Sequence, residues 1–113
     1  GHAHEMAHLS QVTMRLHFES LLWYPGSWDY AAEEIFPGGM HRNREYYKQW
    51  VDLKRPLEFW QEYLLYDPQT SGGLLMAVAP DQAPDLLARL MQANEPSALI
   101  GSVEPGDGRI LIE

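Results

Sequence analysis

The chain has 113 residues, enough for one domain with a single hydrophobic core. Its composition, 45% hydrophobic and 21% charged, is that of a globular protein and excludes intrinsic disorder. Eight Lys and Arg residues against sixteen Asp and Glu residues give a formal net charge of −8, which argues against binding the backbone of DNA or RNA over a broad surface.

The sequence contains no cysteine, which excludes a disulfide framework, a cysteine-based zinc site and a cysteine nucleophile. No apolar run approaches the roughly 18 residues of a membrane span, and the polar, His-rich first ten residues do not resemble a signal peptide. We therefore expect a cytoplasmic protein with neither a membrane nor a nucleic acid as partner. The chain lacks an initiator Met and opens in an expected helix, so we also expect a piece of a longer protein.

The first third of the chain predicts a helix, a strand and a second helix. Residues 3–9 lack Gly and Pro and carry a narrow apolar stripe, which is typical of a short helix. Residues 12–18 alternate between apolar and polar side chains, the period of a half-buried strand. After a Pro-Gly turn, Ser27 can cap a helix over residues 28–36, and the Pro-Gly-Gly at residues 37–39 would end it.

The middle of the chain gathers positive charge and then forms a loop. Residues 40–55, the basic segment, hold five of the eight basic residues, mixed with aromatics. Pro56 suits the first turn of a helix that would run to about Leu64. A polar loop follows at residues 67–73, and the continuous apolar run at residues 74–79 predicts a strand buried on both faces.

The last third predicts one helix and a β-hairpin. Pro84 opens a helix that would end near Ala93, with leucines on its inner face. Residues 98–103 and 109–112, joined by a Pro-Gly-Asp-Gly turn, predict the hairpin. Because helices and strands interleave, we expect one α+β (α/β two-layer) domain over residues 1–113, with a mixed β-sheet covered by helices.

The sharpest short motif is an H-E-x-x-H sequence at residues 4–8. His4 and His8 would share one face of a helix and could hold zinc, while Glu5 could activate a zinc-bound water. Catalytic zinc needs a third protein ligand, and neither later histidine stands at the spacing of the extended motif. A small zinc hydrolase is therefore one alternative hypothesis, and exposed polar residues on a terminal helix are the simpler interpretation.

The loop at residues 67–73 is the second candidate site. Its two adjacent glycines allow close backbone approach, Thr70 and Ser71 offer hydroxyls, and backbone N–H groups in such a turn can form an anion-binding nest. Phosphate suits that chemistry, although a tight connection into the next strand explains the same residues. The Arg-Asn-Arg at residues 42–44 could likewise meet a phosphate or form a solvated face.

Four stretches carry a family resemblance. Residues 67–75, Asp-Pro-Gln-Thr-Ser-Gly-Gly-Leu-Leu, resemble the D-P-Q-T-S-G-G-L-L signature of the selenophosphate synthetase (selenide, water dikinase) family. Residues 1–7 resemble its G-H-x-x-E-M-A pattern, residues 37–43 its P-G-G-x-x-x-N segment, and residues 100–110 its C-terminal hairpin. The similarity covers essentially the whole chain and indicates the C-terminal domain. Both His4 and His8 fall at variable positions of the family pattern.

The resemblance implies a fold and a reaction. Family members share the architecture of aminoimidazole ribonucleotide synthetase, in which an N-terminal domain dimerises and binds ATP and a C-terminal domain closes over it. They make selenophosphate, AMP and orthophosphate from selenide, ATP and water, with Mg²⁺ neutralising the phosphates. The partners expected for this chain are thus the N-terminal domain of the same protein and, through it, a second copy in a homodimer.

The resemblance also limits which residues can carry the chemistry. The family's catalytic Cys or selenocysteine, its essential Lys and its metal-binding Asp residues would all lie upstream of Gly1. We therefore assign no catalytic residue and no metal ligand to this chain. We expect the chain by itself to be inactive and to hold no cofactor, because Mg²⁺ and ATP would be bound mainly by the N-terminal domain. A free-standing acidic binding module that uses the basic segment is a non-enzymatic alternative. The candidates for phosphate binding at the interdomain cleft are Asp67, Gln69, Thr70, Ser71, Gly72, Gly73 and Asn43.

Overall fold

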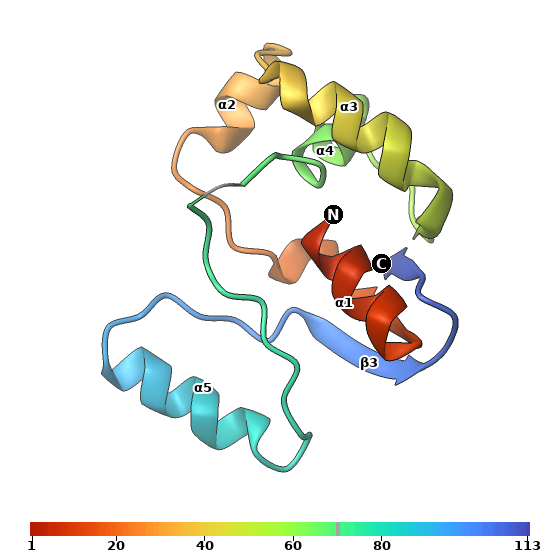
Figure 1. The fold of residues 1–113 in the computed structure, drawn as a ribbon. Coiled ribbons are helices and arrows are strands. Elements are labelled where there is room, and N and C mark those ends of the chain that lie inside the picture. Colours follow the sequence, from red (N-terminus) through yellow and green to blue (C-terminus); the bar gives the residue numbers. More distant parts are fainter. Residues whose placement is uncertain (70) are drawn as a thin grey trace.

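A four-stranded sheet with helices around it makes up the fold of the computed structural model, which describes residues 1–69 and 71–113 (Figure 1). No helix among these residues has the length and apolar character needed to span a membrane. The elements in chain order are α1 (His2–Ser10), β1 (Val12–Leu16), the 3₁₀ helix η1 (Phe18–Ser20), α2 (Ser27–Ala32), α3 (Gly38–Tyr47), the 3₁₀ helix η2 (Lys48–Trp50), β2 (Val51–Leu53), α4 (Phe59–Leu64), α5 (Ala83–Gln92), β3 (Gly101–Pro105) and β4 (Ile110–Ile112).

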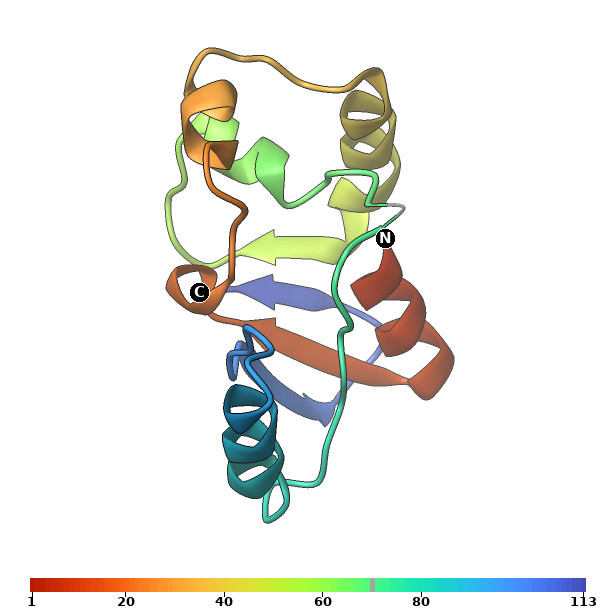
Figure 2. The ribbon, with the colours of Figure 1, turned by 90° about the vertical axis from the view of Figure 1, so that its left-hand side faces the viewer.

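The strands lie in the order β2-β4-β1-β3, which Figure 2 shows as a stack. Strand β1 pairs antiparallel with β3, where Met14 lies opposite Val103, and parallel with β4, where Met14 lies opposite Ile110. Strand β2 pairs parallel with the other side of β4, with Val51 opposite Ile110. The predicted α+β domain with a mixed sheet is therefore confirmed.

The predicted C-terminal hairpin is wrong. Strands β3 and β4 do not pair with each other, because β1 lies between them. The turn at residues 106–109 carries the chain past the start of β1, where the N–H of Gly108 donates to the carbonyl of Val12 and the N–H of Met14 donates to the carbonyl of Arg109. All three residues of β4 are buried, so the most apolar strand gains more in the middle of the sheet than it would at an edge beside β3.

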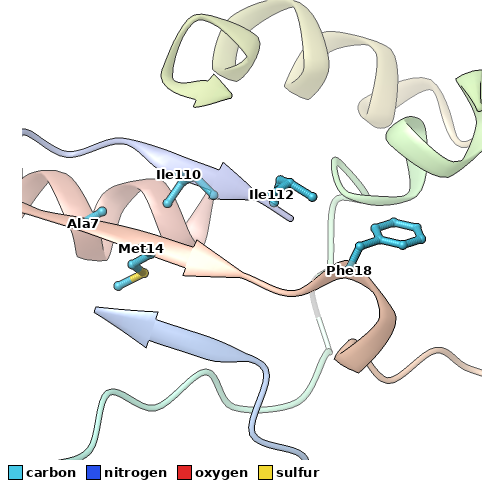
Figure 3. Close-up of a cluster of buried hydrophobic side chains, with 5 residues drawn as sticks. All are labelled: Ala7, Met14, Phe18, Ile110 and Ile112. Carbon is cyan, nitrogen blue, oxygen red and sulfur yellow. The ribbon is translucent and has the colours of Figure 1, made fainter. Parts of the chain in front are cut away.

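The core joins α1 to one face of the sheet (Figure 3). Ala7 of α1 is fully buried, and its short side chain lets the helix backbone approach β1 and β4 closely. Phe18 is also buried, although the predicted strand over residues 12–18 ends at Leu16 and Phe18 opens η1. The buried core residues of this cluster are Ala7, Met14, Phe18, Ile110 and Ile112.

The opposite face of the sheet carries charged side chains paired across the strands. Arg15 of β1 bonds to Glu104 of β3 at 3.0 Å and also pairs with Glu113. Arg109, just before β4, makes two bonds of 2.7 and 2.9 Å to the Asp52 carboxylate of β2, which hold the pKa of that carboxyl below its usual range. Alternation along β1 thus puts Met14 in the core and Arg15 in a charged layer.

A second cluster packs α3 against α4. Its buried residues are Met40, Tyr63 and Tyr66, and the ring of Phe36 stacks on Tyr63 with centroids 5.0 Å apart. The boundary predicted here is wrong in part: α2 ends at Ala32, and the Pro-Gly-Gly segment starts α3 instead of only ending a helix. The fixed φ of proline suits the residue before a helix as well as the residue after one, so that segment alone does not choose between them.

The predicted buried strand at residues 74–79 is also wrong. The segment forms no helix and pairs with no strand among the described residues, and Leu74 and Met76 are 89% and 49% exposed. An apolar run carries no information about its hydrogen-bonding partner, and the buried middle of the sheet is already filled by β4 and β1. The helix predicted from Pro84 does form, as α5, at the opposite end of the molecule from α3 (Figures 1 and 2).

Gly101 tests the pairing of β3 with β1. A Cβ at this position would overlap the carbonyl oxygen of Arg15, which belongs to the backbone and cannot swing away. We expect Gly101→Ala to lower the free energy of unfolding by about 1–3 kcal/mol or more, the range of overpacking changes. The matched control is Ser102→Ala, at the exposed next residue of the same strand, which should stay within about 0.5 kcal/mol of the parent. Urea unfolding followed by tryptophan fluorescence measures both, and equal midpoints would contradict the register.

Candidate functional site

The signature loop comprises residues 67–73, and Pro68 in it lies against the first turn of α3. The structure thus brings together two stretches that resemble the same family. A Cβ on Gly39 would stand 2.9 Å from Cγ of Pro68. The loop therefore packs closely against α3 at this point because Gly39 has no side chain. The amide nitrogen Nδ2 of Asn43 donates to the carbonyl oxygen of Tyr66 at 3.0 Å, across 23 residues of sequence. Asn43 therefore holds the start of the loop and does not line the loop's open side.

The loop starts from a buried anchor. Tyr66 is 4% exposed, and its N–H donates to the carbonyl of Tyr63 at the end of α4. Burial, with the nearby charge of Glu62, raises the pKa of the Tyr66 phenol to about 12, although Arg44 opposes the shift. The phenol is therefore neutral at physiological pH and serves as a packed support for the loop.

An ion pair fixes α3 to α4 below the loop. The Arg44 guanidinium bonds to both carboxylate oxygens of Glu62, at 2.9 and 3.2 Å, and lies 5.1 Å from the centre of the Tyr63 ring. The hydrogen bond to Glu62 raises the pKa of Arg44. This bidentate geometry is the stronger form of an arginine–carboxylate pair, so Arg44 fixes the two helices and is not free to meet a ligand.

A shallow hollow opens at the loop itself. Its volume is about 230 Å³. Inside the loop, the N–H of Gln69 donates to the carbonyl of Asp67 at 2.9 Å, and a Cβ on Gly72 would stand 2.9 Å from Oε1 of Gln69, so a larger residue there must displace that amide. The residues that line this hollow, which we call the loop hollow, are Tyr24, Asp67, Pro68, Gln69, Ser71 and Gly72.

The structure brings together most of the predicted site residues. Four of them line the loop hollow, Gly73 follows it at an exposed position, and Asn43 supports it from α3, whereas Thr70 lies outside the described residues. Tyr24 also lines the hollow but is not among the residues predicted to bind phosphate, because nothing in the sequence links its apolar stretch to the loop. The predicted site residues that line the hollow are Asp67, Gln69, Ser71 and Gly72.

The described groups that line the loop hollow are suited to binding a ligand and do not include a catalytic nucleophile or metal site. The hollow presents one carboxylate, one side-chain amide, two hydroxyls and backbone N–H groups, which can orient a polar or phosphorylated group by hydrogen bonds. Among the described residues, no three His, Cys, Asp or Glu side chains come together as a metal site. The arrangement can thus help to hold a reacting group that other parts of a larger site act on.

The H-E-x-x-H motif is used largely for packing. The imidazole of His4 stacks on the Trp50 ring with centroids 4.3 Å apart, and its Nδ1 bonds to the carbonyl oxygen of Gly108 at 3.0 Å. The His8 ring lies 5.5 Å from that of His4, beside a hollow of about 290 Å³ that Glu5 also lines. The described residues supply no third ligand there, so the zinc hydrolase hypothesis lacks a complete ligand set in this part of the chain.

The chain matches the family described as AIR synthase related protein, C-terminal domain, over residues 1–112. It therefore belongs to that family, whose C-terminal domain the mixed sheet and its helices represent. Over its full length the chain is also 40% identical to a selenide, water dikinase from Photobacterium profundum, of which it covers 32%. It is 40% identical over 99% of its length to a selenide, water dikinase from Geobacter sp. (strain M21), again covering 32% of that protein.

A third relative, a selenide, water dikinase from Burkholderia orbicola (strain MC0-3), is 39% identical over 97% of the chain, which covers 31% of it. The chain thus spans about one third of the length of the curated relatives it matches. These matches confirm the resemblance that residues 67–75 indicated.

Gly39 tests the contact between α3 and the signature loop. An alanine here gains helix propensity but its Cβ presses against the Pro68 ring, whereas the same change at Gly38 meets nothing within 4 Å. We expect Gly39→Ala to be less stable than Gly38→Ala by about 1–3 kcal/mol, with faster amide hydrogen exchange at Asp67 and Gln69. Thermal melts and exchange measured by mass spectrometry check this, and two variants of equal stability and exchange would show that the contact does not constrain the loop.

Proposed function

We propose that this chain works as the C-terminal domain of a selenide, water dikinase, which makes selenophosphate, AMP and orthophosphate from selenide, ATP and water. The observation that carries the proposal is the exposed signature loop, held against the first turns of α3 by Gly39 and Asn43, in a chain similar over its whole length to selenide, water dikinases. Such a surface suits a part of a site that a second domain completes.

The domain acts by closing over the ATP site of the N-terminal domain. Phosphoryl transfer depends mostly on positioning and on stabilising charge, so a binding surface without a nucleophile can still contribute to the rate. Tyr24 lines the loop hollow and is 71% exposed, and nearby Leu22 is 60% exposed, which supports a partner surface next to the hollow. The N-terminal domain supplies the sites for ATP and Mg²⁺ and the contacts of the homodimer, and the enzyme works in the cytoplasm.

The hydroxyls of the signature loop test the proposal. In the full-length enzyme, we expect Thr70→Ala and Ser71→Ala each to reduce selenophosphate formation about tenfold or more, which corresponds to about 1.4 kcal/mol of lost transition-state stabilisation. Their melting temperatures should stay close to that of the parent, because the loss of one side-chain hydrogen bond costs only about 0.5–1.5 kcal/mol. Gly73→Val should be worse, since a branched side chain restricts the backbone and blocks close approach.

Ser97→Ala is the matched control for the loop variants. Its hydroxyl also serves an exposed loop, where it donates to the carbonyl of Glu95, but it does not line the loop hollow. It should therefore leave turnover unchanged. Normal turnover in Thr70→Ala and Ser71→Ala enzymes of near-normal stability would refute a functional role of the loop and leave only its role as a turn.

The chain by itself tests where ATP binds. We expect isothermal titration of this chain with Mg-ATP at physiological salt to give no micromolar binding, because the groups that hold the nucleotide belong to the N-terminal domain. The full-length enzyme, titrated in the same buffer, is the positive control. A one-site isotherm of micromolar affinity for the chain alone would place a nucleotide site within these 113 residues and contradict the division of labour proposed here.

A further inference from the structure

The loop hollow lacks the charge that a phosphate needs. Among the described residues that line it, Asp67 contributes the only carboxylate, and none is a Lys or Arg. A phosphate group carries one to two negative charges at neutral pH, and hydroxyls and N–H groups beside a carboxylate would hold it weakly. A cation from outside the lining must therefore face the hollow if the hollow binds phosphate.

The ion pairs of the chain leave few cations available. Among the described residues, six of the eight Lys and Arg side chains have a carboxylate oxygen within 4.0 Å. Two have no such partner there, Arg42 on α3 and Arg89 on α5. In a chain with twice as many acidic as basic residues, an arginine without a carboxylate partner is the exception. The six paired residues are Arg15, Arg44, Lys48, Lys54, Arg55 and Arg109.

Of these two arginines, Arg42 is the one beside the signature loop. Its Nη2 lies 3.9 Å from the point where a Gly39 Cβ would stand, and Cγ of Pro68 lies 2.9 Å from the same point. The guanidinium and the Pro68 ring, which lines the loop hollow, thus flank one position on the surface of α3. Arg89 belongs to α5, at the other end of the molecule (Figures 1 and 2).

The side chains of residues 42–44 point in three different directions, because consecutive residues of an α-helix are rotated by about 100° about its axis. Arg44 faces α4 and is bound by Glu62, and Asn43 bonds to the carbonyl of Tyr66 below the loop. Arg42 is exposed on the side where Gly39 meets Pro68. Because Asn43 and Gly39 both fix the start of the loop to α3, the backbone of α3 holds Arg42 next to the loop hollow, and its exposed side chain can reach a group bound there.

We infer that Arg42 contacts a phosphate group bound at the loop hollow, and so supplies the positive charge that the signature loop lacks. This inference rests on the proposed function, in which the phosphate belongs to ATP or to the orthophosphate product. A guanidinium is permanently charged, and its planar set of donors can bind two phosphate oxygens at once. Arg42 is then a binding residue of the phosphoryl-transfer site, contributed by this domain to a reaction whose nucleophile lies elsewhere.

The test uses the full-length enzyme and varies Arg42 and Arg89 in the same way. Steady-state selenophosphate formation is measured against ATP concentration, with inhibition by inorganic phosphate as a second probe. We expect Arg42→Gln to lower kcat/KM for ATP by about ten- to a hundredfold and to weaken phosphate inhibition, as the loss of a charged hydrogen bond predicts. Arg42→Lys should recover part of the loss, and Arg89→Gln should match the parent.

Chemical rescue distinguishes a direct contact between Arg42 and phosphate from an indirect effect of Arg42 on packing. Methylguanidinium added to the Arg42→Ala enzyme should restore part of its activity, which a fault in packing would not allow. The inference is overturned if Arg42→Gln keeps kcat/KM and phosphate inhibition within twofold of the parent, or if Arg89→Gln falls by the same factor. In either case an active parent enzyme leaves the proposed function standing. If the parent makes no selenophosphate, the proposed function fails and the role of Arg42 fails with it.

Discussion

The burial of the last strand between β1 and β2 is the interaction on which the rest of the structure depends. Ile110, Leu111 and Ile112 are all buried, and fully burying such side chains contributes roughly 1.5–3 kcal/mol each. The residue after this strand also fixes the end of β1 and the start of η1. The N–H of Glu113 donates to the carbonyl of Leu16, and the N–H of Phe18 donates to the carbonyl of Glu113. Helix α1 packs on the surface that results, and β2 pairs with the free side of β4.

A second constraint places the site. The pair between Arg44 and Glu62 and the bond from Asn43 to Tyr66 hold α3, the end of α4 and the start of the signature loop as one unit. Glycine at position 39 lets Pro68 come against the helix. Residues 67–69 at the start of the loop are therefore exposed and still have a defined position, which a surface must have if it is to orient a phosphate group for a reaction. The residues that fix the loop and the residue proposed to contact phosphate thus lie in the same short segment of α3.

The chain divides into a well-packed part and an open part. All the buried residues fall between Ala7 and Tyr66 or between Gly108 and Ile112, and the described residues from Asp67 to Asp107 contain none. The strand β3 and helix α5 belong to the open part, where Leu99 and Met91 are 65% and 63% exposed. The signature loop lies at the boundary, with its start anchored by Tyr66 and its end leading into the exposed segment.

Local pattern was enough to predict what depends on neighbours in sequence. The stripe of residues 3–9 predicted α1, the alternation along residues 12–18 predicted β1, and the Pro at position 84 predicted the start of α5 within one residue. The nine residues 67–75 indicated the family, because a long run of specific residues carries information that no single turn requires. Four of the predicted site residues do line one hollow, because they are neighbours within this run.

Tertiary structure alone decided which strands pair and which basic side chains have a carboxylate partner among the described residues. Adjacent strands joined by a Pro-Gly turn predict a hairpin, but β1 separates β3 from β4, because burying Ile110 and Ile112 in the middle of the sheet outweighs the short loop. Likewise, the sequence presents Arg42 and Arg44 as equals, and only the position of Glu62 on a later helix makes one a structural ion pair and leaves the other beside the signature loop. Pairing and charge partnership depend on residues far apart in sequence, which a local pattern does not record.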